Sequence, residues 1–302
     1  MDDTRYPVAS IVGDFHARYR IGRVRPRADL TNGEIFRRFR SIIYGYFRRY
    51  GRDLPWRRTD DPYHILVSEV MLQQTQVARV AQKFPEFIEA FPTVEALASA
   101  SLVRVLSVWR GMGYNRRARH LRDIARLLAE AHGGLVPDDH DILASLPGIG
   151  PATAASILAF AFNRPTVFIE TNIRAVFIHF FFPKGNAVSD GAILPLVESA
   201  VDRRAPWRWY SALMDYGAML KRRFPNPSRV SDRHRRQKPF QGSMRQLRGM
   251  TLRALLDRPG LTPHGIARLT GWSREDVKRA IEMLCREGLV EVRGEKVYLA
   301  ED

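Results

Sequence analysis

Residues 146–151 read Leu-Pro-Gly-Ile-Gly-Pro, and this short stretch decides much of the fold. Helical patterns of apolar residues lie on both sides of it, over 140–146 and 151–162. Pro147 ends the first helix, the two glycines allow a sharp turn with exposed amides, and Pro151 suits the first position of the next helix. Because backbone N–H groups at a helix start attract anions, we expect this turn to bind one phosphate group.

A turn of this kind resembles the helix-hairpin-helix motif, which holds a DNA backbone without contacting the edges of the bases. The turn alone has a plain structural alternative, because many helix pairs are joined by glycine-rich turns. The composition favours the DNA interpretation, since 48 Lys and Arg residues against 32 Asp and Glu residues give a net charge of +16. Such an excess of positive charge favours a polyanion as partner.

The sequence also limits where the protein works. No stretch reaches the ~18 uninterrupted apolar residues that a membrane span needs. The first residues lack the basic and apolar regions of a secretory signal. A single cysteine, Cys285, leaves no intramolecular disulfide, and the spacing of the histidines predicts no metal site. We therefore expect a monomeric cytoplasmic protein, associated with the nucleoid, that has no membrane partner.

Helical periodicity runs through most of the chain. Between residues 32 and 200, apolar residues recur every three or four positions, with polar or Gly/Pro breaks between the helical stretches. The first 30 residues show no clear period, and we predict an irregular arm there. A mainly α protein of about two domains follows, at the usual ~100–200 residues per domain. The predicted helices span 32–49, 62–78, 80–90, 94–100, 102–110, 116–131, 140–146, 151–162 and 191–200.

The C-terminal segment, 246–302, has a layout of its own. Helical stretches precede two short apolar runs on either side of Arg293-Gly294-Glu295, a pattern typical of a hairpin. Three helices followed by a hairpin predict a small winged helix-turn-helix module, whose last helix either enters a DNA major groove or binds a protein partner. Its helices are expected over 247–257, 263–270 and 273–287.

A strongly basic segment, 221–245, lies between these two regions. Two interpretations of it stay open, because a run of charges can be a solvated linker or an ordered loop that contacts DNA phosphates. The basic residues that make up the run lie within 221–238 and are Lys221, Arg222, Arg223, Arg229, Arg233, Arg235, Arg236 and Lys238.

Two acidic residues stand out by their surroundings. Glu69 lies inside the predicted helix over 62–78, with Val67, Val70 and other apolar residues around it. A carboxyl group among apolar neighbours stays protonated to higher pH, which suits a general acid. Glu170 follows an apolar run and precedes a helical stretch, so we expect it at a helix start. Each also has a structural alternative, because helices often carry a glutamate and acids often cap helix starts.

The most specific motif surrounds Glu69, where residues 67–77 read Val-Ser-Glu-Val-Met-Leu-Gln-Gln-Thr-Gln-Val. Further motifs lie before and after it, within residues 35–220. They are Leu54-Pro55-Trp56-Arg57, Asp61-Pro62-Tyr63, Phe91-Pro92-Thr93, Trp109-Arg110-Gly111-Met112-Gly113-Tyr114, Arg117-Ala118-Arg119, the turn at 146–150 and Met214-Asp215-Tyr216-Gly217-Ala218-Met219. In this order they closely resemble the MutY-type adenine DNA glycosylases of the helix-hairpin-helix superfamily.

The resemblance implies a two-lobed glycosylase domain over 31–220 that binds double-stranded DNA and turns the target base out of the helix. Glu69 corresponds to the family's glutamate that protonates the departing adenine, and Glu170 falls at the catalytic aspartate. The residues expected in the base pocket or wedged into the duplex are Gln73, Gln74, Tyr114, Asn115, Ala152 and Asn172. The hairpin residues expected to bind phosphate, often with a monovalent cation, are Gly148, Ile149 and Gly150.

Departures from the family pattern affect the expected chemistry. Glu170 replaces the aspartate, and its extra methylene moves the carboxylate outward by ~1.5 Å unless the backbone adjusts. A misplacement of that size can cost ~100-fold in rate, so altered geometry or an altered substrate is expected. Ala152 stands where bifunctional relatives have the lysine that forms a Schiff base. Because alanine has no amine, the resemblance implies a monofunctional enzyme without lyase activity.

Other departures concern the cofactor and the lesion. Four cysteines usually follow the 214–219 motif and hold a [4Fe–4S] cluster, but Lys221 stands at the first of these positions. One cysteine cannot hold the cluster, so we expect none, and the basic segment is expected to take over its DNA contact. Asn115 departs from an aromatic pair of the family. The winged helix stands where the family has a Nudix-like domain that recognises 8-oxoguanine, so specificity for adenine opposite 8-oxoguanine does not follow.

These features favour a monofunctional DNA glycosylase of base excision repair, with an adenine mismatch as the favoured substrate. Glu69 would protonate the base, and an ionised Glu170 would oppose the positive charge that develops on the sugar. Two alternatives stay open. Either the enzyme removes another base, such as uracil, thymine, hypoxanthine or another lesion, or the chain is a catalytically inactive DNA-binding homologue.

Overall fold

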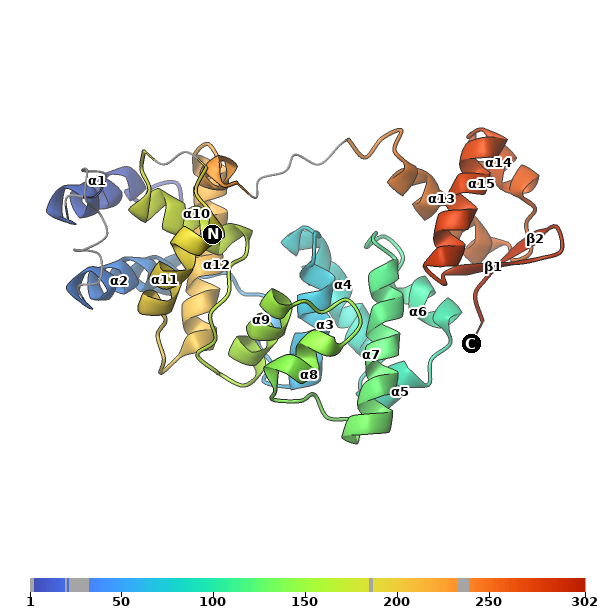
Figure 1. Cartoon of the computed structure of the whole chain (residues 1–302), viewed down its shortest axis with the longest axis horizontal. Coiled ribbons are helices and arrows are strands. Elements are labelled where there is room, and N and C mark those ends of the chain that lie inside the picture. Colours follow the sequence, from blue (N-terminus) through green and yellow to red (C-terminus); the bar gives the residue numbers. More distant parts are fainter. Residues whose placement is uncertain (1–2, 20, 22–32, 185–186, 233–238, 302) are drawn as a thin grey trace. The chain divides into compact units, whose positions relative to one another are not determined.

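The computed structural model describes residues 3–301, except 20, 22–32, 185–186 and 233–238. The described elements are nearly all helices, with a two-stranded sheet near the C-terminal end (Figure 1). None of these helices combines the length and the apolar character needed to cross a membrane. The chain divides into two compact units, which agrees with the predicted two-lobed, mainly α fold. The first consists of Met1–Leu54, Asp138–Asp141 and Gly150–Arg235, and the second of Pro55–Pro137, Ile142–Ile149 and Arg236–Asp302.

The helices of the first unit surround an aromatic core. They are α1 (Val8–Tyr19), α2 (Gly33–Tyr50), α9 (Pro151–Ala161), α10 (Thr171–Phe181), α11 (Asp190–Ala200) and α12 (Pro206–Arg223), followed by a 3₁₀ turn, η2 (Pro227–Val230). The helices α10 and α12 pack along each other, and α2 packs on α12. Phe39 of α2 lies at the centre, with its ring 5.2 Å from Phe177 and 5.7 Å from Trp209 in edge-to-face contacts.

The structure corrects two predictions in this unit. Part of the predicted arm over 1–30 is the helix α1, because Val8, Val12 and Phe15 share one helix face and are buried in the core. The basic segment begins inside a helix rather than in a loop, since α12 continues through residues 221–223.

The second unit contains the glycosylase motifs on either side of residue 69. Its elements are a 3₁₀ turn, η1 (Pro55–Arg57), then α3 (Pro62–Leu72), α4 (Val77–Ala90), α5 (Val94–Ala98), α6 (Leu102–Val108), α7 (Arg116–His132) and most of α8 (His140–Ser145). The long helix α7 packs against α3, α5 and α6. The prediction of a single helix over 62–78 was wrong. The helix α3 ends at Leu72, Gln74 adopts a left-handed φ of 54°, and α4 begins at Val77.

The C-terminal part of this unit confirms the predicted winged helix-turn-helix. Its elements are α13 (Met244–Asp257), α14 (Pro263–Thr270), α15 (Arg274–Arg286), β1 (Val290–Arg293) and β2 (Lys296–Leu299). The two strands pair antiparallel, with Arg293 opposite Lys296, and Gly294 makes the turn with a φ of 61°. The Ser273 hydroxyl caps α15 by accepting a hydrogen bond from the Asp276 N–H at 3.1 Å.

Candidate functional site

Glu69 lies near the end of α3, a helix fixed by its start and by its packing. The Asp61 carboxylate caps the helix by accepting from the Tyr63 N–H at 2.8 Å, and Pro62 takes the first helical position. Most of α3 is buried, including both neighbours of Glu69, whereas Glu69 itself is half-buried. The helix therefore holds the Glu69 backbone rigidly and leaves its side chain partly open to a substrate.

The loop after α3 carries the two glutamines predicted to wedge into DNA. Gln73 is the C-cap of α3, and its side-chain amide donates a hydrogen bond to the Gly148 carbonyl oxygen at 3.2 Å. Gln74 is exposed and has a φ of 54°, which is unusual for a residue other than glycine. Strained residues of this kind cluster at functional sites, which fits a residue that must point out of the protein surface.

The hairpin turn joins α8 to α9 as predicted. Gly148 has a φ of 75°, and a Cβ at this position would overlap the ring of His120, so only glycine fits. Ile149 is buried and anchors the turn, with its N–H bonded to the Leu146 carbonyl oxygen at 3.1 Å. Gly150 precedes α9 without a side-chain cap. An anion can therefore take the place of a cap there. A monovalent cation at this turn stays a prediction.

Ala152 lies exposed in the first turn of α9, as the hairpin prediction requires. Its methyl group offers neither an amine nor a hydrogen bond to a substrate.

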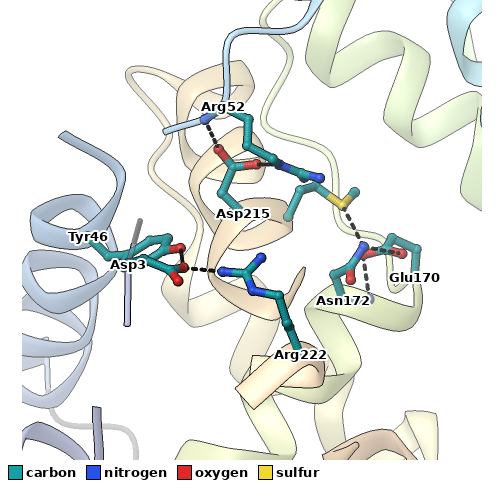
Figure 2. A network of polar contacts seen from close by, with 8 residues as sticks. Asp3, Tyr46, Arg52, Glu170, Asn172, Asp215 and Arg222 are labelled. Carbon is teal, nitrogen blue, oxygen red and sulfur yellow. Dashed lines mark hydrogen bonds and ion pairs between the residues drawn. The ribbon is translucent and has the colours of Figure 1, made fainter. Parts of the chain in front are cut away.

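Glu170 is the N-cap of α10, as predicted from its position after an apolar run (Figure 2). Its Oε1 accepts hydrogen bonds from the backbone N–H groups of Asn172 at 2.6 Å and Ile173 at 3.0 Å. Its Oε2 accepts a third from the side-chain amide of Asn172 at 3.3 Å. The positive end of the α10 dipole also favours an anion there. The carboxylate is thus held in one orientation.

The charge of Glu170 is set by opposing effects. Burial raises the pKa of this carboxyl group above its ordinary value, whereas the positive charge of Lys221 and the hydrogen bonds from Asn172 and Ile173 act to lower it. For the Lys221 ammonium the effects are reversed: burial lowers its pKa, whereas the negative charge of Glu170 acts to raise it. Lys221 and Glu170 therefore influence each other's pKa. No pattern in the sequence indicates this interaction.

The contact between α10 and α12 depends on a glycine of the 214–219 motif. A Cβ at Gly217 would overlap the backbone of Asn172, so the absence of a side chain lets the two helices approach each other. The Asn172 amide then reaches the Met214 sulfur at 3.8 Å as well as Glu170. Gly217 thereby supports the residue that orients Glu170.

Two more of the residues predicted to bind phosphate, Arg222 and Arg223, have partners within the first unit. Arg222 pairs with the carboxylate of Asp3, which also accepts a hydrogen bond from the Tyr46 hydroxyl (Figure 2). Arg223 donates to the carbonyl oxygens of Asp3 at 3.0 Å and Tyr6 at 2.8 Å. These arginines tie α12 to the segment before α1. Arg229 is exposed, while Arg233, Arg235, Arg236 and Lys238 lie outside the described residues.

Figure 2 also shows an ion pair without a predicted role, between Arg52 and the buried Asp215. The Arg52 backbone N–H and Nε donate to the two carboxylate oxygens at 2.8 and 2.7 Å. Asp215 belongs to the quoted 214–219 motif, so the motif itself was a signal for this contact.

Tyr114 and Asn115 lie just before α7. Tyr114 is exposed with a φ of 48°, and its hydroxyl accepts a hydrogen bond from Arg245 of α13 at 3.2 Å. Asn115 is half-buried and precedes the first turn of α7 without capping it.

The predicted site residues divide between the two units. Contacts among these residues include that of Gln73 with Gly148 in the second unit, and those of Glu170 with Asn172 and Lys221 in the first. The second unit contains Glu69, Gln73, Gln74, Tyr114, Asn115, Gly148 and Ile149, and the first contains Gly150, Ala152, Glu170, Asn172 and Lys221.

The residues present do not fit the iron–sulfur cluster of the family. Cys285, the single cysteine, lies in α15, far along the chain from the end of α12 where the cluster ligands would begin. Lys221 occupies that end and interacts electrostatically with Glu170.

Comparisons with known proteins relate the chain to enzymes of base excision DNA repair. The family model described as "HhH-GPD superfamily base excision DNA repair protein" matches residues 67–192. Adenine DNA glycosylase of Mycolicibacterium smegmatis is 35% identical over 270 residues, which cover 82% of this chain and 91% of that protein. Adenine DNA glycosylase of Mycobacterium tuberculosis is 43% identical over 135 residues, which cover 44% of each chain. The chain thus spans about half the length of several curated relatives that it matches.

Solved structures show the same fold. A thermostable thymine-DNA glycosylase aligns with a TM-score of 0.57 and 25% identity, covering 65% of this chain and 94% of that one. A non-covalent endonuclease III–DNA complex aligns with a TM-score of 0.50 and 20% identity, covering 64% of this chain and 86% of that one. Together with the match along nearly the whole M. smegmatis protein, these findings show that the chain belongs to the adenine DNA glycosylase family of the HhH-GPD superfamily.

Proposed function

We propose that the chain is a monofunctional DNA glycosylase that hydrolyses the N-glycosidic bond of an adenine in mismatched double-stranded DNA. The observation that carries this proposal is the Glu170 carboxylate, fixed at the start of α10 by the amides of Asn172 and Ile173. A carboxylate fixed in this way opposes positive charge on a sugar without first having to reorient, which lowers the activation barrier. The extent of the match to the M. smegmatis enzyme supports adenine as the base.

In the proposed reaction, Glu69 is the general acid and Glu170 is the electrostatic stabiliser. Glu69 donates its proton to the base, and the bond between the base and C1′ of the sugar breaks with its electron pair moving to the base. Glu170 opposes the positive charge left on the sugar. A water molecule then adds to C1′ and releases a proton, which leaves an abasic site and balances the proton given to the base.

DNA binding is proposed to involve the hairpin turn and the exposed basic residues. The uncapped start of α9 supplies backbone N–H groups for one phosphate, and Arg229 supplies an exposed positive charge. We further propose that the protein acts as a monomer and without a [4Fe–4S] cluster, because it lacks the cysteines to hold one.

A panel of duplexes tests the proposed substrate. Single-turnover release of adenine, uracil, thymine and hypoxanthine is measured opposite each normal base and opposite 8-oxoguanine, with Glu69→Gln as the control. We expect adenine release from a mismatch, and no release by Glu69→Gln although it still binds the duplex. If only another base were released, that base would be the substrate and the proposal of adenine would be wrong. If the wild type and Glu69→Gln behaved alike on every duplex, a catalytically inactive DNA-binding protein would remain.

A further inference from the structure

The side chain of Arg117 joins the two loops that carry Gln74 and Tyr114. Arg117 lies in the first turn of α7, and only 6% of it is exposed. Its Nη1 donates to the carbonyl oxygens of Val70 at 2.9 Å and Met71 at 2.7 Å, at the end of α3. One guanidinium nitrogen therefore binds the last turn of the helix that carries Glu69.

The other terminal nitrogen of Arg117 reaches both loops. Nη2 donates to the Thr75 hydroxyl at 2.8 Å, in the loop that contains Gln74. It also donates to the Gly113 carbonyl oxygen at 3.2 Å, in the loop that contains Tyr114. A planar group with donors in a fixed fork can span these four acceptors, whereas the single ammonium of a lysine cannot.

The positive charge of Arg117 is stabilised by dipoles. Among the described residues, no carboxylate pairs with Arg117, and its partners are carbonyl and hydroxyl oxygens. The carbonyls of Val70 and Met71 form the negative end of the α3 dipole, which favours a cation. Burial lowers the pKa of Arg117 to about 10, so the group stays charged at neutral pH. The Trp109 and Tyr114 rings lie 5.2 and 5.4 Å from the guanidinium carbon.

Both loops hold a residue in an unfavourable backbone conformation. Gln74 and Tyr114 have φ values of 54° and 48°, in the left-handed region that glycine prefers. Such conformations persist only where surrounding contacts enforce them. The hydrogen bonds of Arg117 to Thr75 and Gly113 act one residue away from Gln74 and Tyr114 respectively.

We propose that Arg117 is a positioning residue for opening the duplex, which holds Gln74 and Tyr114 in the conformations that enter the DNA. The proposal rests on the proposed function. Arg117 acts through the two loops, so it contributes to extruding the target base and not to breaking the glycosidic bond. Its substitution should therefore matter when the base is paired and stacked, and matter little when the base has no pairing partner.

The variant Arg117→Lys tests this separation, because it keeps the charge and removes the fork. Single-turnover release is measured from a mismatched duplex and from a duplex in which the target base lies opposite an abasic-site analogue. We expect a loss of ~100-fold on the mismatch, the size associated with an ångström-scale misplacement, and a rate close to that of the wild type on the second duplex. 2-Aminopurine placed beside the target reports extrusion directly, and its fluorescence change on binding should be smaller for the variant.

Arg126→Lys is the matched control. Arg126 lies on the same helix and its Nε donates to the Ala98 carbonyl oxygen at 3.1 Å, away from both loops, so this variant should extrude the base like the wild type. Thr75→Val removes one acceptor of Arg117 and serves if Arg117→Lys does not fold. It should give a smaller loss, confined to the mismatch.

The outcomes separate the proposal from the proposed function. A folded Arg117→Lys protein that loses the same factor on both duplexes, with unchanged 2-aminopurine fluorescence, would overturn the positioning role. So would Arg117→Lys or Thr75→Val with wild-type rates on the mismatch. If the wild type releases no base from any duplex, the glycosylase proposal fails. The fluorescence comparison still tests the role of Arg117 in extrusion.

Discussion

The side-chain amide of Gln73 donates a hydrogen bond to the carbonyl oxygen of Gly148, 3.2 Å away. This bond ties the loop after α3 to the hairpin turn, although 75 positions separate Gln73 from Gly148 in the sequence. The bond therefore links, within the second unit, the glutamine loop to residue 148 of the turn. A phosphate that orders the turn would also limit the movement of the glutamine loop, because the Gln73 amide is bonded to the Gly148 carbonyl oxygen.

The pH dependence of base release should follow Glu170 on its acid side. In the proposed reaction Glu170 is an anion, and burial raises its pKa above that of an ordinary glutamate. As the solution is acidified, the rate of base release should therefore begin to fall at a higher pH than it would with an ordinary glutamate. Lys221→Met removes a positive charge that lowers this pKa. The acid limb of the pH–rate profile, where the rate falls with falling pH, should therefore move to still higher pH. Single-turnover rates of both proteins across pH check this prediction.

Lys184→Met is the control for that experiment, because Lys184 is an exposed lysine of the same unit. Its acid limb should coincide with that of the wild type. An acid limb that Lys221→Met leaves in place would show that Lys221 does not influence Glu170.

Gly217→Ala should destabilise the first unit and slow base release. The added methyl group would overlap the backbone of Asn172 and push α10 away from α12, which disturbs the residue that orients Glu170. Overpacking of this kind costs about 1–3 kcal/mol of unfolding free energy. Denaturant unfolding and single-turnover rates measure the two effects.

Gly45→Ala offers a matched comparison, since Gly45 lies in α2 of the same unit and a Cβ there meets nothing within 4 Å. It should raise the unfolding free energy by about 0.5–1 kcal/mol, because alanine favours a helix over glycine. Equal effects of the two substitutions would contradict the close approach of α10 and α12.

Borohydride should trap no covalent complex between the protein and its DNA substrate. Ala152 provides no amine at the position where bifunctional relatives form a Schiff base, so hydrolysis should stop at the abasic site. Reduction during turnover followed by denaturing electrophoresis detects any adduct. Efficient trapping would mean that another amine has taken this role, and Lys221, half-buried beside Glu170, would be the first to test by substitution.

Duplex binding should weaken steeply as salt rises. Each phosphate contacted by a basic side chain releases condensed counterions, so the logarithm of the binding constant falls by about 0.9 per contact for each tenfold rise in salt. The slope, measured with a duplex that carries an abasic-site analogue, counts these contacts. Arg229→Ala should reduce the slope by about one contact if this exposed arginine binds a phosphate. A slope near zero for the wild type would contradict a binding mode based on phosphates.

Features that depend on neighbouring residues in the sequence were predictable. Features that depend on contacts between distant segments were not. Glu170 was correctly expected at a helix start because an acid after an apolar run and before a helical stretch is a local signal. Its interaction with Lys221 depends on how α10 and α12 pack, and no local pattern records it. The break after Leu72 was missed because no glycine or proline marks it.

The helix α1 was missed for a different reason. Val8, Val12 and Phe15 are spaced four and three residues apart, which is a helical spacing, but polar and charged residues around them dilute the pattern. Arg117 lay inside a quoted motif, yet its role depends on four acceptors in three other segments.

The first unit is discontinuous in the sequence, and this affects how the protein can fold during synthesis. The first unit takes residues from both sides of the second, because Met1–Leu54 packs with Gly150–Arg235. The apolar face of α2 leaves the ribosome early, and Phe39 on it meets Phe177 of α10 and Trp209 of α12 only after most of the chain has been made. This interval leaves Phe39 and its neighbours open to aggregation or to chaperones. Neither unit can therefore be produced as one uninterrupted fragment.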